Sequence, residues 1–298
     1  MTPVQPYAKL TRLSPLVRRL VADNPGPFTF TGTATHIVGH GQVAVIDPGP
    51  DDDAHVSAIL AATAGEEITA ILVTHTHRDH TGALAALRAA SDAEVLGCAS
   101  HSFARPLREG EANPLEASGD RAYAPDRILT GGDTVSGPGW TLEAVPTPGH
   151  IANHLAFALH EENALFPGDH VMGWSTTIVA PPEGSMRAYR ASLQRLLARS
   201  EQRYYPAHGE LIEDGPARAA ELLQHRKGRE QQILEALRQG AATPEAIVER
   251  IYSGLAPALK GAAALSVLAH LEDLVERNLV RAEAARFLLT APSCSDRS

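Results

Sequence analysis

The first part of the chain alternates short apolar runs with amphipathic stretches. Residues 33–47 alternate apolar and polar positions around a turn at 40–41, which predicts a β-hairpin. Residues 51–64 and 81–90 have helical periodicity, and a continuous apolar run of strand length at 68–74 lies between them. This order of strand, helix, strand and helix predicts a domain of mixed α/β class.

Further strands and one helix are predicted between residues 93 and 205. The segment 102–126 is rich in proline, glycine and charge and has no clear period, which predicts a long loop or a partly helical lid. An amphipathic helix is expected at 186–200. Short strands are expected at 93–98, 140–145, 155–159, 164–166 and 203–205.

The pattern changes near residue 215. From residue 217 to 289 almost all periodicity is helical, and Thr243 precedes Pro244 as an N-cap precedes the first helical residue. Three helices followed by a short extended hairpin are typical of a winged helix. We therefore expect three parts: a catalytic α/β domain at 1–215, a winged-helix-like domain at 216–290 and a flexible tail at 291–298.

Composition excludes several classes of protein. Apolar residues make up 44% and charged residues 20%, which indicates a globular chain. No apolar run approaches the roughly 20 residues of a membrane helix, so we expect no membrane contact. Two cysteines exclude a disulfide framework and favour the cytoplasm. The net charge of −9 disfavours a general nucleic-acid binder.

The most informative segment is Thr74-His75-Thr76-His77-Arg78-Asp79-His80, directly after an apolar strand. Imidazole nitrogens are good ligands for zinc, and alternate side chains of a loop can face one point. His75 and His77 are expected to face one point, and Asp79 and His80 a second point nearby. This spacing favours a two-metal site, with a solvated histidine-rich loop as the alternative for the segment taken alone.

The full series of motifs resembles the metallo-β-lactamase superfamily. The first motif is followed in order by Thr147-Pro148-Gly149-His150, Pro167-Gly168-Asp169 and Pro206-Ala207-His208-Gly209. The resemblance implies a four-layer αββα sandwich and two Zn²⁺ ions, with iron or manganese as alternatives. It implies one metal held by His75, His77 and His150, a second held by Asp79, His80 and His208, and Asp169 bridging both.

Residues around these ligands are assigned supporting roles or left open. Asp47 resembles an early aspartate of the family that supports the site without binding metal. His154 is either such a partner or a structural histidine. His170 is expected to face away from the metals, because neighbours on an extended segment face opposite sides.

Two polar clusters also have alternative interpretations. Ser175, Thr176 and Thr177 could donate hydrogen bonds to a substrate, although turn chemistry is the commoner role of such a run. The basic cluster at residues 226, 227 and 229 is expected to be a solvated helix face, with anion binding as the less favoured alternative.

A narrower resemblance extends over the C-terminal part of the chain. Residues 24–29, 175–177, 225–226 and 229–233 are similar to β-lactamase-like hydrolases with a C-terminal winged-helix domain. One animal member of that group is a mitochondrial endoribonuclease. The group therefore defines the architecture better than it defines the substrate.

These resemblances imply a dinuclear zinc-dependent hydrolase. A metal-bridging hydroxide, oriented by Asp79, would attack an ester, thioester, lactam or phosphodiester bond of a small-molecule or anionic substrate. The alternatives are an iron-dependent oxidative member of the superfamily and a nucleic-acid-binding or endoribonuclease protein acting through the winged helix. Residues 218–289 carry 10 basic and 9 acidic side chains, which disfavours nucleic acid. The leucine-rich helix faces suggest a homodimer.

Overall fold

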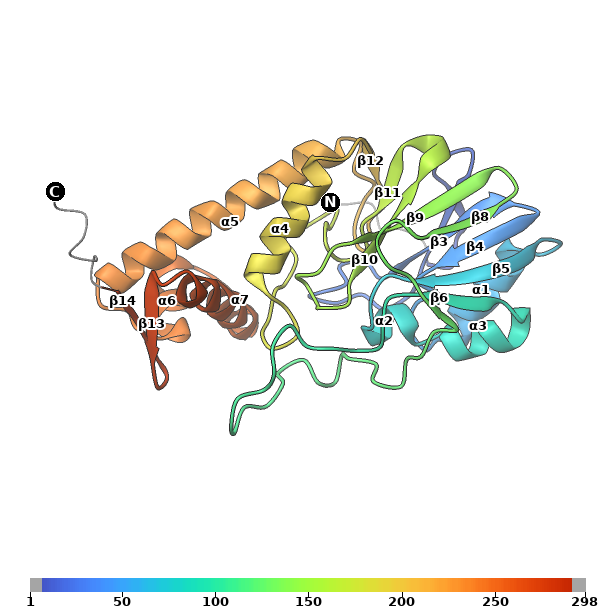
Figure 1. The fold of residues 1–298 in the computed structure, drawn as a ribbon. Helices are drawn as coiled ribbons and strands as arrows, with labels where there is room; N and C mark the ends of the chain where they lie inside the picture. The colour runs from blue at the N-terminus through green and yellow to red at the C-terminus, as the bar shows by residue number, and fades with distance from the viewer. Residues whose placement is uncertain (1–6, 291–298) are drawn as a thin grey trace.

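The computed structural model describes residues 7–290. Two β-sheets face each other, helices cover their outer surfaces, and a helical module lies beside them at the C-terminal end (Figure 1). The expected tail at 291–298 lies outside the described residues. Among the described residues, no helix combines the length and apolar character needed to cross a membrane.

The first sheet has seven strands, arranged across the sheet in chain order. Pairing is antiparallel as far as β4 and parallel from β4 onward. The hairpin expected at 33–47 is confirmed, with Gly41 at its turn. The strands are β1 (Thr11–Arg12), β2 (Val17–Val21), β3 (Ala34–His40), β4 (Gln42–Ile46), β5 (Glu67–Val73), β6 (Glu94–Gly97) and β7 (Arg127–Ile128).

The second sheet has five strands in the order β12-β11-β10-β9-β8. Its pairing is antiparallel except between β11 and β12. A short 3₁₀ helix, η1 (His160–Glu162), joins β10 to β11. The strands are β8 (Thr134–Gly137), β9 (Trp140–Pro146), β10 (Leu155–Leu159), β11 (Ala164–Phe166) and β12 (Arg203–Tyr204).

Both faces of the first sheet are buried, which explains its nearly continuous apolar strands. Along β4, Ala44 and Ile46 pack between the sheets, whereas Val43 and Val45 pack toward the helices α1 (Asp53–Ala62) and α3 (Leu84–Ser91). The helix α4 (Met186–Leu197) covers the outer face of the second sheet. The expected four-layer αββα arrangement is thus confirmed.

Two segments differ from their expected form. The helix expected at 81–90 begins later than expected, as α3, and a separate turn of helix, α2 (Arg78–Thr81), precedes it. The segment 102–126 contains turns but no helix, so the partly helical alternative is wrong. This loop lies against the C-terminal module, where the Arg105 guanidinium is 2.8 Å from a carboxylate oxygen of Glu272.

The C-terminal module has the winged-helix order expected from the sequence. It contains α5 (Gly215–Arg238), α6 (Pro244–Ile251), α7 (Pro257–Glu276) and the hairpin of β13 (Val280–Glu283) and β14 (Arg286–Leu289). The Thr243 side chain caps α6 as predicted. The long helix α5 packs against α4 at Leu222 and enters the core of the module at Ile233, so the domain boundary near 215 stays a prediction.

Candidate metal centre and cavity

The seven proposed ligands lie on four segments that each follow a strand, with Asp79 and His80 in the short helix α2. One segment follows β5, and three follow strands of the second sheet, namely β9, β11 and β12. In the second sheet, β9, β11 and β12 run in the same direction, so the segments that follow them leave the sheet at the same edge. The two sheets face each other, and the segment that follows β5 meets these three at that edge. The four segments bring together His75, His77, Asp79, His80, His150, Asp169 and His208 in two adjacent groups.

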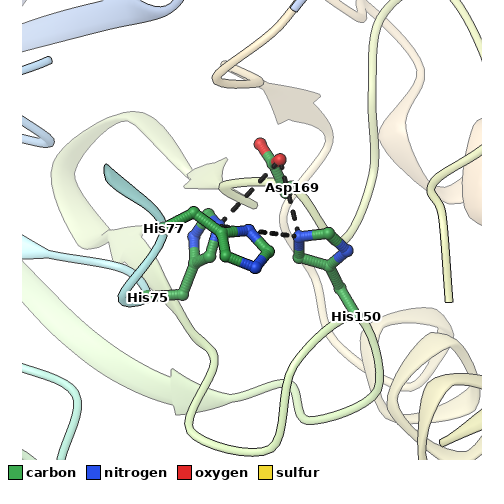
Figure 2. A group of neighbouring side chains, drawn as sticks. All are labelled: His75, His77, His150 and Asp169. Carbon is green, nitrogen blue, oxygen red and sulfur yellow. Dashed lines mark hydrogen bonds and ion pairs between the residues drawn. The ribbon is translucent and has the colours of Figure 1, made fainter. Parts of the chain in front are cut away.

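The first group contains His75, His77, His150 and Asp169, whose potential ligand atoms lie within 4.8 Å of one another (Figure 2). The Nδ1 atom of His77 lies 3.0 Å from the Nε2 atoms of both His75 and His150. Ligand atoms of tetrahedral zinc, each about 2.0–2.1 Å from the ion, are about 3.3–3.4 Å apart. The spacing and the donor types therefore fit a zinc ion.

The second group contains Asp79, His80 and His208. The Asp79 Oδ2 atom lies 3.4 Å from His80 Nε2 and 3.3 Å from His208 Nε2. The Thr33 hydroxyl donates to the same carboxylate oxygen at 3.1 Å and fixes its orientation. His80 Nε2 is buried without a hydrogen-bond partner among the described residues, so in the neutral form of the ring this atom could bind a metal ion.

Asp169 lies between the two groups. Its Oδ2 atom is 3.7 Å from His150 Nε2 and 4.0 Å from His75 Nε2. Its Oδ1 atom is 3.2 Å from His208 Nε2 and 3.4 Å from His80 Nε2. One carboxylate oxygen thus faces each group, which is the geometry of a bridging ligand.

The histidine rings are held by oxygen atoms on the side away from the centre. His150 Nδ1 lies 2.7 Å from the Ile178 carbonyl oxygen, and His208 Nδ1 lies 3.3 Å from that of Gly32. Because a carbonyl oxygen can only accept, these Nδ1 atoms must carry a proton, and in the neutral form of each ring Nε2 is the atom that can bind a metal ion. Such partners fix the tautomer and orientation of metal-binding histidines.

Asp47 lies next to the proposed ligands, where it contacts Thr74 and His80. It is 2% exposed and accepts hydrogen bonds from the Thr74 amide at 2.8 Å, the Thr74 hydroxyl at 2.8 Å and His80 Nδ1 at 2.9 Å. One carboxylate therefore connects the end of β5 to His80, a proposed ligand in α2.

The buried charges set the protonation of the centre before metal binding. Burial lowers the pKa of His75 well below its usual value and that of His150 to about 4, so both rings are neutral. Burial also acts to lower the pKa of His208, but Asp169 and Asp79 outweigh it and raise that pKa to about 10. In the metal-free chain, a protonated His208 therefore partly balances the two carboxylates.

Glu183 is a member of the site that sequence patterns do not reveal. It is fully buried, and its Oε2 atom accepts from His77 Nε2 at 3.1 Å, so His77 Nδ1 faces the centre with its lone pair. Asn113, in the loop at 102–126, donates to Glu183 Oε1 at 2.6 Å. Burial acts to raise the pKa of Glu183, but hydrogen bonds from His101 and His77 outweigh it and keep the group ionised.

We expect Glu183→Gln to weaken zinc binding by about 10- to 100-fold, because the uncharged amide no longer fixes the tautomer of His77. Competition with a chromogenic chelator measures this affinity. Glu116→Gln makes the same substitution at an exposed position in the loop at 102–126 and is the matched control. Equal zinc affinities for the two variants and the wild type would contradict this positioning role.

His154 and His170 occupy different places, although both are buried. His154 Nε2 accepts from the Asp169 amide at 3.2 Å, and its Nδ1 lies 2.8 Å from the Thr147 hydroxyl. It thus positions the backbone of Asp169, which favours the first of its two interpretations. His170 packs against Tyr189 of α4 with ring centroids 4.6 Å apart, and it belongs to neither ligand group.

The run of hydroxyl residues at 175–177 divides between two roles. The Thr177 hydroxyl donates to the Asp169 carbonyl oxygen at 2.6 Å, so it stabilises this loop. Ser175 and Thr176 line a cavity in front of the metal groups. A direct contact with substrate therefore stays a prediction for these two residues.

This cavity has a volume of about 580 Å³, which suits a small organic ligand. It is lined on one side by proposed ligands, including His77, His150 and Asp169, and on the other by residues of α5 and α7. The C-terminal module thus forms one wall of the cavity.

The expectation of a solvated basic cluster on α5 is wrong for two of its three residues. Lys227 is exposed, but Arg226 is 3% exposed and Arg229 is half-buried, and both arginines line the cavity. The helix turns by about 100° per residue, so residues 226 and 229 share a face that residue 227 does not. The packing of α5 turns that face inward.

Comparisons with known proteins agree with this architecture. Residues 28–208 match the model of the metallo-beta-lactamase superfamily, and residues 243–286 match that of the beta-lactamase associated winged helix domain. The chain therefore belongs to the metallo-β-lactamase superfamily and carries the associated winged-helix domain. It is an enzyme of the hydrolase type found in this superfamily, with His and Asp groups that could bind metal ions.

Individual relatives align over most of the chain. A beta-lactamase-like protein 2 homolog of Caenorhabditis elegans is 30% identical over 94% of this chain and 90% of its own length. An atrochrysone carboxyl ACP thioesterase of Aspergillus chevalieri is 32% identical over 83% of this chain and 76% of its own length.

A solved structure supports the fold. The crystal structure of a metallo-beta-lactamase family protein from Thermus thermophilus has a TM-score of 0.76 and 24% identity, covering 94% of this chain and 100% of its own. The similarity therefore includes both the sandwich and the C-terminal module.

Proposed function

We propose that this chain is a dinuclear zinc hydrolase that cleaves small acyl thioesters or esters. The observation that carries the proposal is the position of Asp169, whose two oxygens each face one group of buried histidines at the base of a cavity. His75, His77 and His150 would hold one ion, and Asp79, His80 and His208 the other.

Bound zinc would supply a nucleophilic hydroxide near neutral pH and would polarise the substrate carbonyl. Side chains of the protein would orient the nucleophile. Asp79 is 27% exposed on its side chain, so its carboxylate can accept a hydrogen bond from the nucleophile while Thr33 holds it in place. In the net reaction, water adds to the acyl carbon, the C–S or C–O bond breaks, and the leaving group takes a proton.

The choice of a thioester over the other bonds rests on the relatives. Two fungal relatives, at 32% and 31% identity, are named as ACP thioesterases. The cavity accommodates a small acyl group, and Phe28 and Trp174 offer aromatic surface in its lining. A phosphodiester substrate is less favoured because the chain carries a net charge of −9.

The proposal is tested by elemental analysis of the purified protein, together with thioesterase and esterase assays. We expect about two zinc ions per chain, loss of turnover on chelation and recovery when zinc is returned. Iron in place of zinc, with oxygen uptake and no zinc-dependent hydrolysis, would overturn the proposal in favour of an oxidative enzyme. Cleavage of RNA but not of acyl substrates would overturn it in favour of a nuclease. A cytoplasmic location and a homodimer stay predictions.

A further inference from the structure

Arg226 and Arg229 stand out because both guanidinium groups are held in place at the wall of the cavity. The Arg226 guanidinium carbon lies 5.2 Å from the ring centroid of Tyr189, and that of Arg229 lies 3.9 Å from the ring centroid of Tyr252. Arg226 also donates to the Thr177 carbonyl oxygen. Stacking on an aromatic ring fixes the planar group, so little conformational entropy remains to be lost when a ligand binds.

In the described part of the chain, neither of these two arginines forms an ion pair with a carboxylate. Glu230, one turn beyond Arg226 on α5, pairs instead with Arg190 at 2.6 Å and Arg277 at 2.7 Å. Within residues 7–290, the buried Nε atoms of Arg226 and Arg229 have no hydrogen-bond partner. The carboxylates in the lining of the cavity are Asp79 and Asp169, which belong to the metal groups.

A buried guanidinium without a counter-charge is unfavourable, because burial removes its hydration. A ligand anion in the cavity would supply both the missing charge and acceptors for the free N–H groups. The same wall carries apolar side chains from the C-terminal module, including Leu255, Leu259 and Ala263. The cavity thus combines a reaction centre, an apolar surface and arginine side chains, with Arg78 in its lining besides Arg226 and Arg229.

We propose that Arg226 and Arg229 form an anion subsite that binds a carboxylate or phosphate of the substrate away from the bond that is cleaved. The proposal rests on the hydrolase function proposed above and specifies its substrate class as an anionic acyl thioester or ester. The anion lies either at the end of the acyl chain, as a carboxylate, or on the thiol part, as a phosphate.

The test compares substrates that differ in a distal charge. One arm uses N-acetylcysteamine thioesters with a terminal carboxylate, from glutaryl to suberyl, against the same thioesters with a neutral terminal amide. The other arm uses an acyl-coenzyme A, which carries phosphates, against the corresponding acyl-pantetheine. We expect wild-type kcat/KM to be about 10- to 100-fold higher for the charged member in one arm, which identifies the source of the anion.

Substitutions on α5 then test whether the two arginines cause the preference for charged substrates. Arg226→Gln and Arg229→Gln should each bring the ratio of charged to neutral kcat/KM close to one. Lys227→Gln removes the same charge from the exposed face of the helix, so it should leave the ratio unchanged. Because Arg226 is buried, Arg229→Gln provides the answer if Arg226→Gln fails to fold.

Binding to the metal-free chain separates this proposal from the hydrolase proposal. Calorimetric titrations with suberate, and with coenzyme A against pantetheine, should give binding that both glutamine variants lose. If the wild type binds these anions but hydrolyses none of the substrates, the result supports the anion subsite and contradicts the proposed hydrolase function. If the wild type turned over charged and neutral substrates with equal kcat/KM in both arms, the anion subsite would be refuted. It would also be refuted if both glutamine variants kept the wild-type ratio of charged to neutral kcat/KM.

Discussion

Asp169→Asn is expected to lower kcat/KM by about 1,000-fold or more, since it removes the group that faces both metal positions. The asparagine keeps the shape of the side chain but replaces one carboxylate oxygen with an NH₂ donor. That donor cannot bind a metal ion, and it would face the Nε2 atoms of one of the two histidine groups. We therefore also expect the zinc content to fall from two ions to one or fewer.

The fold should survive this change, because the loop of Asp169 is held by other contacts. The Asp169 amide donates to His154 Nε2, and its carbonyl accepts from Thr177, and neither bond involves the side chain. Circular dichroism of the metal-free variant should match that of the wild type. Asp51→Asn is the matched control, since Asp51 is exposed. Wild-type turnover in Asp169→Asn would show that the bridge is not needed.

Asp47→Ala is expected to lower the free energy of unfolding by about 3 kcal/mol or more, because three buried donors lose their acceptor. Two of these donors belong to Thr74 at the end of β5, and the third is His80 Nδ1. Urea unfolding of the metal-free chain measures the stability. We also expect loss of the zinc ion that His80 is proposed to bind, because the ring is then free to rotate or change tautomer.

Asp47→Asn separates stability from metal binding. Asp47 has a positive φ of 51°, a conformation that asparagine tolerates better than alanine. The amide retains one acceptor, so we expect a smaller loss of stability than in the alanine variant but the same loss of zinc. Asp51→Ala should change neither quantity. An Asp47→Ala chain with the stability and zinc content of the wild type would refute this supporting role.

Much of the sandwich could be predicted because strand and helix periods are local properties. The hairpin of β3 and β4 and the capped start of α6 both appear where the residue pattern places them. The pattern predicts less where the helical period is short, as in the single turn α2 that precedes α3. The loop at 102–126 has no period, and its role emerges only from contacts such as that between Asn113 and Glu183.

The sequence by itself determined the class of fold and a set of candidate ligands. Each ligand motif spans only a few consecutive residues directly after a predicted strand, so it can be recognised without knowledge of the tertiary structure. Only the tertiary structure decided that Glu183 touches His77 and that Arg226 and Arg229 face a cavity while Lys227 faces solvent. The physical reason is that these roles depend on packing between distant segments. A helix can present any face to its neighbours, and the contact between α5 and α4 selects which face lines the cavity.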